Sequence, residues 1–271
     1  MKTDAALRPE DFRWMGRALE LAARGAGMTS PNPAVGAVLV AAGRAVGEGF
    51  HARAGAAHAE AEALGQAGAA ARGATLYVTL EPCNHTGRTA PCVDAITTAG
   101  VKRVVVAISD PNPRVSGGGA AALSRSGVDV TVGCREREAM EINRVFIIAA
   151  RRGRPHATLK WAATLDGATA DARRASRWIT GPEARLEAHR MRSYADAVVV
   201  GIGTALADDP GLDVRLGRPW PREPFRVVVD TRARLPVSAR LIGAGKPERA
   251  LVAITDAADP ERVENLETRG V

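Results

Sequence analysis

Apolar residues recur every three to four positions between residues 9 and 24, which predicts a helix with one apolar face. The members of that face are Phe12, Met15, Leu19 and Ala22. From residue 34 to residue 150, short runs rich in branched apolar residues alternate with alanine-rich stretches. The predicted strands are 34–40, 44–49, 74–80, 102–109 and 128–132, and the predicted helices are 58–71, 91–99, 119–125 and 135–150. This alternation predicts an α/β domain in which helices cover a sheet.

A short polar segment at residues 151–155 interrupts this pattern and marks the boundary between two predicted domains, residues 1–150 and 155–271. The length of 271 residues agrees, because one domain takes roughly 150 residues. Beyond the boundary, the predicted strands are 157–162, 197–200, 226–229 and 250–254, and the predicted helices are 182–194 and 260–267. The second domain is therefore also expected to be α/β.

The composition limits the class of protein. Hydrophobic residues make up 46% of the chain and charged residues 25%, which is typical of a protein that buries a core. No stretch approaches the roughly 20 apolar residues of a membrane helix. The start of the chain carries Asp4 and Glu10 and lacks the apolar centre of a secretion signal. We therefore expect a cytoplasmic protein without a membrane partner.

The net charge of +7 indicates an anionic partner, either nucleic acid or a phosphorylated small molecule. No run of five or six cations occurs, and four Trp, four Phe and two Tyr offer few surfaces on which bases could stack. Both features argue against nucleic acid and favour the small molecule. The three cysteines are too few for a disulfide framework. One of them, Cys134, has no motif around it and is expected to be a packing residue.

The other two cysteines belong to a constellation that predicts a zinc site. His58, Cys83 and Cys92 supply one imidazole and two thiolates, and a catalytic zinc takes three such ligands and keeps one position for water. Cys92 stands at a predicted helix start, where the positive dipole end favours a thiolate. Glu60 lies two residues after His58, so that it can face the water without being a ligand. The order of these residues is the signature of zinc deaminases.

A closed structural zinc site is the alternative, with His85 as the fourth ligand. In that case the chain would be a non-catalytic zinc protein that binds nucleic acid through its positive charge. A closed structural site does not account for the presence of Glu60 two residues after His58, so the catalytic interpretation is favoured. The gap of eight residues between Cys83 and Cys92 departs from the general signature, which has two.

Several motifs make the chain resemble the bifunctional riboflavin biosynthesis family over nearly its whole length. In the first domain they are Pro31-Asn32-Pro33-Ala34-Val35-Gly36, His58-Ala59-Glu60, the stretch from Glu81 to Cys92, and Asp110-Pro111-Asn112-Pro113. In the second they are Lys160, Thr164-Leu165-Asp166-Gly167, Ser176-Arg177-Trp178-Ile179-Thr180, Gly201-Ile202-Gly203-Thr204 and Ala207-Asp208-Asp209-Pro210.

The resemblance implies a three-layer cytidine-deaminase-like N-terminal domain and a dihydrofolate-reductase-like α/β C-terminal domain. The first would use Zn²⁺ to deaminate 2,5-diamino-6-(5-phosphoribosylamino)pyrimidin-4-one, with Glu60 carrying the proton to the leaving nitrogen. The second would use NADPH to reduce the ribosyl chain of the product, 5-amino-6-(5-phosphoribosylamino)uracil. The partner would be a small phosphoribosyl pyrimidine. A homo-oligomer is expected only because that is the general default.

The resemblance also implies binding roles, residue by residue. In the deaminase half, the substrate contacts would be Asn32, His51 and Arg88. In the reductase half, the substrate contacts would be Ser176, Arg192, Leu212 and Arg215, and the cofactor contacts would be Ala163, Trp178, Thr204, Asp208 and Thr231. Two arginines and a serine suit a phosphate, and Trp178 could pack on a flat ring.

The chain departs from the family at its C-terminus. Two earlier predicted helices end in a Gly-Val pair that leads into a strand. Arg269-Gly270-Val271 contains the same pair, but no strand follows it in this sequence. The family's reductase half continues further, with a glycine-rich cofactor segment and an acidic residue facing the substrate. We therefore expect a reductase domain that is cut short, and a protein that acts only as a deaminase is the alternative function.

Overall fold

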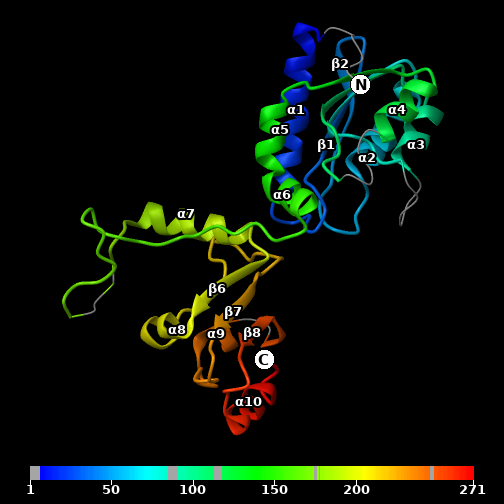
Figure 1. Cartoon of the computed structure of the whole chain (residues 1–271). Coiled ribbons are helices and arrows are strands. Elements are labelled where there is room, and N and C mark those ends of the chain that lie inside the picture. Colours follow the sequence, from blue (N-terminus) through cyan, green and yellow to red (C-terminus); the bar gives the residue numbers. More distant parts are fainter. Residues whose placement is uncertain (1–6, 85–90, 113–117, 174–175, 177, 245–246) are drawn as a thin grey trace. The chain divides into compact units, whose positions relative to one another are not determined.

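The computed structural model describes residues 7–84, 91–112, 118–173, 176, 178–244 and 247–271 (Figure 1). The chain divides into two compact units, Met1–Ala157 and Thr158–Val271, which are described separately below. In the described part of the chain, no helix has the length and apolar character that crossing a membrane requires.

The first unit is built on a five-stranded sheet. Its strands in spatial order are β2 (Arg44–Phe50), β1 (Gly36–Ala41), β3 (Thr75–Leu80), β4 (Arg103–Ile108) and β5 (Asp129–Val132). β1 pairs antiparallel with both β2 and β3, whereas β3, β4 and β5 run parallel. The parallel strands place the loops that follow them at one edge of the sheet.

Helices cover both faces of this sheet, which confirms the three-layer fold. They are α1 (Pro9–Gly25), α2 (Ala59–Ala67), α3 (Cys92–Thr98), α4 (Gly118–Arg125), α5 (Glu136–Ile142) and α6 (Arg144–Arg152), with a 3₁₀ turn η1 (Gly68–Ala71) after α2. One apolar core joins α2, α3 and α4 to the sheet side chains Leu39, Leu76 and Val104. The second core joins α1, α5 and α6 to the opposite face, which carries Val38, Tyr77 and Val105. Cys134 is fully buried in the second core, as expected of a packing residue.

Two helix predictions in this unit are wrong in detail. The single helix predicted over 135–150 is divided at Asn143, whose φ of −102° and ψ of 15° depart from helical values. The side-chain Oδ1 of Asn143 accepts from the N–H of Ala34 at 2.8 Å, and Nδ2 donates to the oxygen of Ala34 at 2.9 Å. On α1, Phe12 is 47% exposed and not part of the apolar face. The neighbouring Asp11 is fully buried in its place.

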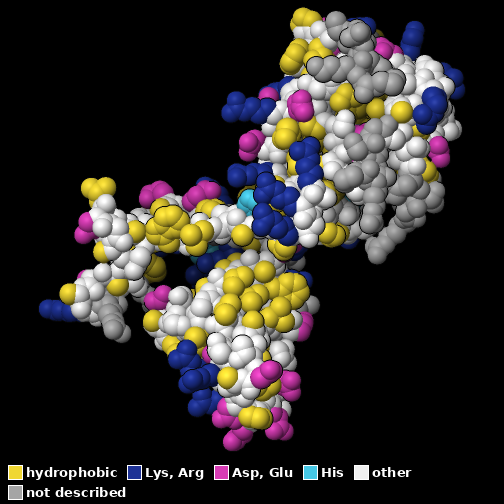
Figure 2. Space-filling view, in the orientation of Figure 1, with side chains coloured by type: hydrophobic (Ala, Val, Ile, Leu, Met, Phe, Trp, Pro, Cys, Tyr) yellow, Lys and Arg dark blue, Asp and Glu magenta, His cyan; other side chains and the backbone are white. Residues whose placement is uncertain are grey.

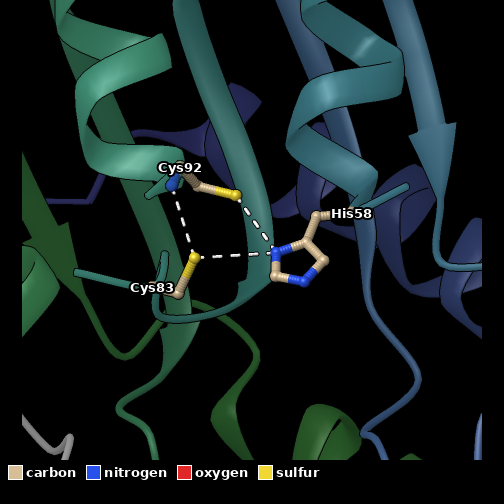
Figure 3. Close-up of side chains that lie close together, drawn as sticks. All are labelled: His58, Cys83 and Cys92. Atoms are coloured by element: carbon tan, nitrogen blue, oxygen red, sulfur yellow. Dashed lines mark hydrogen bonds between the residues drawn. The ribbon is translucent and has the colours of Figure 1, made fainter. Parts of the chain in front are cut away.

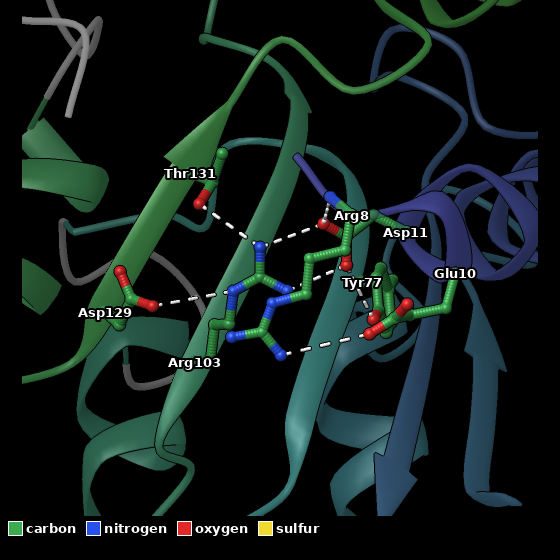
Figure 4. Close-up of polar contacts among 7 residues, drawn as sticks. All are labelled: Arg8, Glu10, Asp11, Tyr77, Arg103, Asp129 and Thr131. Carbon is green, nitrogen blue, oxygen red and sulfur yellow. Dashed lines mark hydrogen bonds and ion pairs between the residues drawn. The ribbon is translucent and has the colours of Figure 1, made fainter. Parts of the chain in front are cut away.

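Asp11 is buried because a set of donors surrounds its carboxylate (Figure 4). Arg103 on β4 donates to both oxygens, at 2.7 and 2.9 Å, and the hydroxyl of Tyr77 on β3 donates at 2.9 Å. The backbone N–H of Arg8 adds a bond at 2.8 Å. Burial by itself would raise the pKa of Asp11, but these donors hold the pKa below its ordinary value. The network therefore joins α1 to two central strands.

This lowered pKa predicts a pH dependence of stability. A carboxyl group whose pKa is lower in the folded protein than in the unfolded chain stabilises the fold at any pH above its unfolded-chain pKa of about 3.9. This contribution is lost as the pH falls from there toward the pKa of the folded protein. The difference in free energy of unfolding between the wild type and Asp11→Asn should therefore be full at pH 7 and shrink below about pH 4. Urea unfolding at several pH values measures it. A difference that stays constant down to pH 2 would contradict the assignment.

The second unit contains a parallel three-stranded sheet, in the order β6 (Ala197–Gly201), β7 (Phe225–Val229) and β8 (Ala250–Ala253). The helices of this unit are α7 (Pro182–Ser193), α8 (Ile202–Asp208), α9 (Arg240–Gly243) and α10 (Pro260–Glu267), with a 3₁₀ turn η2 (Pro247–Arg249) before β8. Asp259 caps α10 as predicted, by accepting from the N–H of Glu261 at 3.0 Å.

One face of the β6–β8 sheet packs on a core and the other is open. Val228, Leu241 and Ala250 belong to the core. The side chains of the open face are apolar, and the largest exposed ones are Val199 at 59%, Phe225 at 39%, Val229 at 52% and Leu251 at 44%. Figure 2 shows hydrophobic side chains gathered on this unit.

The strand predicted over 157–162 is wrong. These residues form no strand, and Leu159 and Trp161 are 80% and 67% exposed. An alternating sequence becomes a strand only where a neighbouring strand offers hydrogen-bond partners, and no described strand pairs with this segment. α8 was not predicted, because its first residues, Ile202 and Gly203, follow a strand without a helix-start signal.

Candidate metal centre

The three predicted metal ligands lie at the edge of the first sheet where the parallel strands end. Cys83 lies three residues after the end of β3, Cys92 is the first residue of α3, and His58 directly precedes α2. Their positions are set by elements of one apolar core, because α2, α3 and β3 all pack in it. Residues far apart in the sequence are thus held together by rigid neighbours.

The ligand atoms of these residues form a compact group (Figure 3). His58 Nδ1 lies 3.2 Å from Cys92 Sγ and 3.6 Å from Cys83 Sγ, and all three atoms lie within 4.8 Å of one another. One imidazole nitrogen and two sulfurs are the donors that zinc prefers, and three protein ligands leave a fourth position for water. The described residues therefore fit a catalytic zinc.

The start of α3 directs its first N–H to the sulfur of Cys83, whereas the sequence suggested that the helix start acts on Cys92. The N–H of Cys92, at the start of α3, donates to Cys83 Sγ at 3.3 Å. Hydrogen bonding by the Cys92 thiol lowers the pKa of Cys83 to about 4, with His58 acting in the same direction against the effect of burial. The pKa of Cys92 is raised by its hydrogen bond to Cys83 and by burial. When both cysteines bind zinc as thiolates, the N–H at the helix start stabilises the charge on Cys83.

Glu60 lies in the first turn of α2 and is 4% exposed. Burial raises the pKa of its carboxyl group above the ordinary value, while the charge of His58 opposes the shift. A buried carboxyl group beside a metal-ligand cluster has the protonation behaviour expected of a proton carrier. Its side chain can therefore exchange a proton near the ligands without occupying a ligand position.

Asn32 and His51 lie beside this cluster and are joined to each other. The ring of His51 packs edge-on against His58, with centroids 5.8 Å apart. His51 Nδ1 lies 2.9 Å from the carbonyl oxygen of Ala57, which can only accept, so Nδ1 carries a hydrogen. In the neutral ring Nε2 then accepts from Asn32 Nδ2, at 3.1 Å. This bond leaves the amide oxygen of Asn32 available to another group.

Two predicted residues near this centre, His85 and Arg88, lie outside the described residues. Conversely, Glu81 is buried at the start of the loop after β3 that carries Cys83, which is called the metal-binding loop, although the sequence alone did not indicate a role for it. The signal that could have found it is the acidic residue directly before Pro82-Cys83, at the end of an apolar strand.

In the second unit, two predicted substrate residues lie close to one loop. Arg192 on α7 donates to the carbonyl oxygen of Asp213 at 2.6 Å, and Arg215 pairs with the carboxylate of Asp213 at 3.0 Å. Burial lowers the pKa of Arg192, and the charge of Arg215 adds to this shift. Two neighbouring arginine side chains repel each other, and an anion such as a phosphate that binds both would relieve this repulsion.

The remaining predicted residues of this unit are dispersed. Ser176 Oγ lies 3.4 Å from a carboxylate oxygen of Asp208, so the structure brings these two together. Leu212 is 4% exposed in the core, and any ligand contact would come from its backbone. Trp178 is 70% exposed, with the guanidinium of Arg185 4.2 Å from its ring centroid. The others are Ala163, half-buried in the segment without a strand, and Thr204 and Thr231, both exposed.

Each of the two units matches a known family of protein domains. Residues 9–108 match the cytidine and deoxycytidylate deaminase zinc-binding region, which contains all three predicted ligands and Glu60. Residues 155–271 match the RibD C-terminal domain.

Whole-chain relatives agree with these matches. The chain is 48% identical over 265 residues to the riboflavin biosynthesis protein RibD of Aquifex aeolicus, covering 98% of this chain and 73% of the relative. It is 46% identical to RibD of Escherichia coli, covering 86% of this chain and 66% of that one.

Solved structures give the same result. Acinetobacter baumannii RibD matches with a TM-score of 0.87 at 44% identity, over 97% of this chain and 72% of that one. A Thermotoga maritima diaminohydroxyphosphoribosylaminopyrimidine deaminase/5-amino-6-(5-phosphoribosylamino)uracil reductase matches with a TM-score of 0.84 at 42% identity, over 93% and 72%.

Proposed function

The chain belongs to the RibD family of bifunctional riboflavin biosynthesis enzymes, and we propose that its deaminase site consists of His58, Cys83 and Cys92 as zinc ligands with Glu60 as the proton carrier. The family pairs a zinc-dependent deaminase with an NADPH-dependent reductase. We assign the deaminase to residues 1–150 and the reductase to residues 155–271. The bifunctional enzyme is favoured over a non-catalytic zinc protein, because both halves match enzyme domains.

The proposed deaminase substrate is the diaminopyrimidine phosphoribosyl compound named for the Thermotoga relative. Bound zinc supplies Lewis-acid activation of a water molecule at this site. Glu60 takes a proton from that water and delivers it to the amino nitrogen that leaves as ammonia. Asn32, oriented by His51, offers its amide oxygen to an N–H on the pyrimidine edge. The observation that carries the proposal is the compact group of one imidazole and two sulfurs beside a buried carboxyl group.

In the deaminase half we also propose that His51 and Arg88 lie near the phosphoribosyl group. In the reductase half we propose Arg192 and Arg215 as the phosphate site, supported by their common contact with Asp213. Ser176 and Leu212 complete the proposed substrate contacts. The cofactor contacts proposed from the family resemblance are Ala163, Trp178, Thr204, Asp208 and Thr231.

We place the protein in the cytoplasm, since its three cysteines are free and zinc-binding thiolates must stay reduced. The homo-oligomer expected from the general default stays a prediction.

Two measurements on the purified chain test the proposed function. Metal analysis should find one zinc per chain, and the diaminopyrimidine substrate should release ammonia. Removing zinc with a chelator should abolish ammonia release, and adding Zn²⁺ should restore it. Ammonia release that persists in chelated protein with no residual zinc would contradict the proposal.

The Asn32 assignment predicts a modest loss of substrate recognition. Asn32→Ala removes one neutral hydrogen bond, worth about 0.5–1.5 kcal/mol, so kcat/KM for deamination should fall by about 2- to 12-fold. His51→Ala should have a similar effect, because Asn32 then loses the acceptor that orients its amide. Steady-state kinetics with metal analysis measure both. Unchanged kcat/KM in Asn32→Ala would remove this residue from the site.

A further inference from the structure

Glu81 connects the metal-binding loop to two segments that supply no ligand. Its side chain is 5% exposed. Oε1 accepts a hydrogen bond from the N–H of Ala120 at 2.9 Å, and Oε2 accepts one from the N–H of Asp110 at 3.0 Å. The carboxylate therefore ties the end of β3 to the loop after β4 and to the first turn of α4. Since burying a carboxylate is costly without donors, these two bonds favour its buried position.

The first turn of α4 also touches the loop directly. A Cβ atom at Gly119 would lie 1.9 Å from the carbonyl oxygen of Pro82, so only glycine allows this approach. Asn84 Nδ2 donates to the carbonyl oxygen of Gly118 at 3.3 Å. By contrast, a Cβ at Gly118 would meet no described atom within 4 Å. The contact surface is thus confined to one face of the turn.

Of the three ligands, these contacts surround the one that lies farthest along the chain from a helix or strand. His58 directly precedes α2 and Cys92 begins α3, whereas Cys83 lies in the loop after β3. The carbonyl oxygen of Cys83 accepts from the N–H of Val93 at 3.3 Å. The direction of the Cys83 side chain consequently depends on where the segment from residue 81 to residue 84 is fastened.

We propose that Glu81 is a positioning residue of the metal centre, which fixes the Cys83 sulfur by fastening its loop to Asp110 and to the Gly119 turn of α4. The inference rests on the proposed zinc site. Groups that orient metal ligands without touching the metal typically contribute 10- to 100-fold to metal affinity. Glu81→Gln keeps one oxygen acceptor and places an NH₂ group against the other N–H donor. Gly119→Ala pushes the Pro82 carbonyl, and with it Cys83, out of position.

The test measures metal binding in the full chain. Zn²⁺ affinity is determined by competition with a chromophoric chelator, and the Co²⁺-substituted protein is examined for its thiolate-to-cobalt absorption. Glu81→Gln and Gly119→Ala should each weaken Zn²⁺ binding by about 10- to 100-fold and reduce the thiolate band. Gly118→Ala, one residue away in open space, should bind Zn²⁺ like the wild type.

A second control separates positioning from general loss of stability. Asp11→Asn weakens another buried carboxylate network in the same unit, and its Zn²⁺ affinity should stay within about twofold of the wild type because no ligand is moved. If Glu81→Gln does not fold, the Zn²⁺ affinities of Gly119→Ala and Gly118→Ala are compared instead, and a loss confined to Gly119→Ala supports the positioning role.

The outcomes are distinguishable. Wild-type affinity and spectrum in the folded Glu81→Gln and Gly119→Ala variants would overturn the positioning role. Equal losses in Gly118→Ala or Asp11→Asn would overturn it as well. A wild-type chain that binds no Zn²⁺ would instead refute the proposed function itself.

Discussion

Replacing Glu60 with glutamine should lower kcat for ammonia release by about 10²- to 10⁴-fold, the usual contribution of a general acid–base group. Glutamine has nearly the same shape and can still form hydrogen bonds, but it cannot take up a proton from water and pass it on. Since Glu60 is not among the three ligand residues, the variant should keep one zinc per chain. Metal analysis and an ammonia assay on the same preparation measure both quantities.

Glu62 provides a matched control. It lies on the same helix, two residues after Glu60, and accepts a hydrogen bond from the N–H of Phe50 at 3.2 Å. Glu62→Gln should therefore leave kcat within about threefold of the wild type, because Glu62 bonds to β2 and is not one of the ligand-cluster residues. A Glu60→Gln variant that retains zinc and full activity would show that another group carries the proton.

Replacing Arg103 with methionine should destabilise the first unit by about 3–5 kcal/mol, because the substitution leaves the Asp11 carboxylate buried without its charged partner. This is a large part of the 5–15 kcal/mol that holds a typical domain together. Asp11 is fully buried and Arg103 nearly so, with 7% of its side chain exposed, so water cannot replace the lost bonds. Urea unfolding followed by circular dichroism gives the change.

A half-exposed ion pair of the same unit is the comparison. Arg17 donates to Glu48 at 2.8 and 2.9 Å, and its side chain is 35% exposed. Arg17→Met should cost about 0–1 kcal/mol, as exposed pairs do. Equal losses in the two variants would mean that burial of the Asp11–Arg103 pair does not govern its contribution.

Much of the first unit could be predicted from the sequence, because its signals are local. Short apolar runs that are buried on both faces locate β1 and β3, and the spacing of His58, Glu60, Cys83 and Cys92 indicates one zinc site. A metal site constrains residue type and order strongly, so a few side chains suffice to identify it. The family resemblance then adds the substrate and the second activity.

What the sequence did not reveal depends on partners distant in the chain. Asn143, where the predicted helix is divided, bonds through its side-chain amide to Ala34, more than a hundred residues earlier. Asp11 replaces Phe12 in the interior only because Arg103 and Tyr77 meet it there. The role of Glu81 likewise requires knowing that Asp110 and Ala120 come together at one sheet edge. No local pattern encodes such pairings.

The open apolar face of the β6–β8 sheet has a calorimetric consequence. Val199, Phe225, Val229 and Leu251 already meet water in the folded state, so unfolding exposes less new apolar surface in this unit. Newly exposed apolar surface is what raises the heat capacity on unfolding. The second unit should consequently unfold with a smaller heat-capacity increment per residue than the first. The stability of the second unit would then vary less steeply with temperature than that of the first.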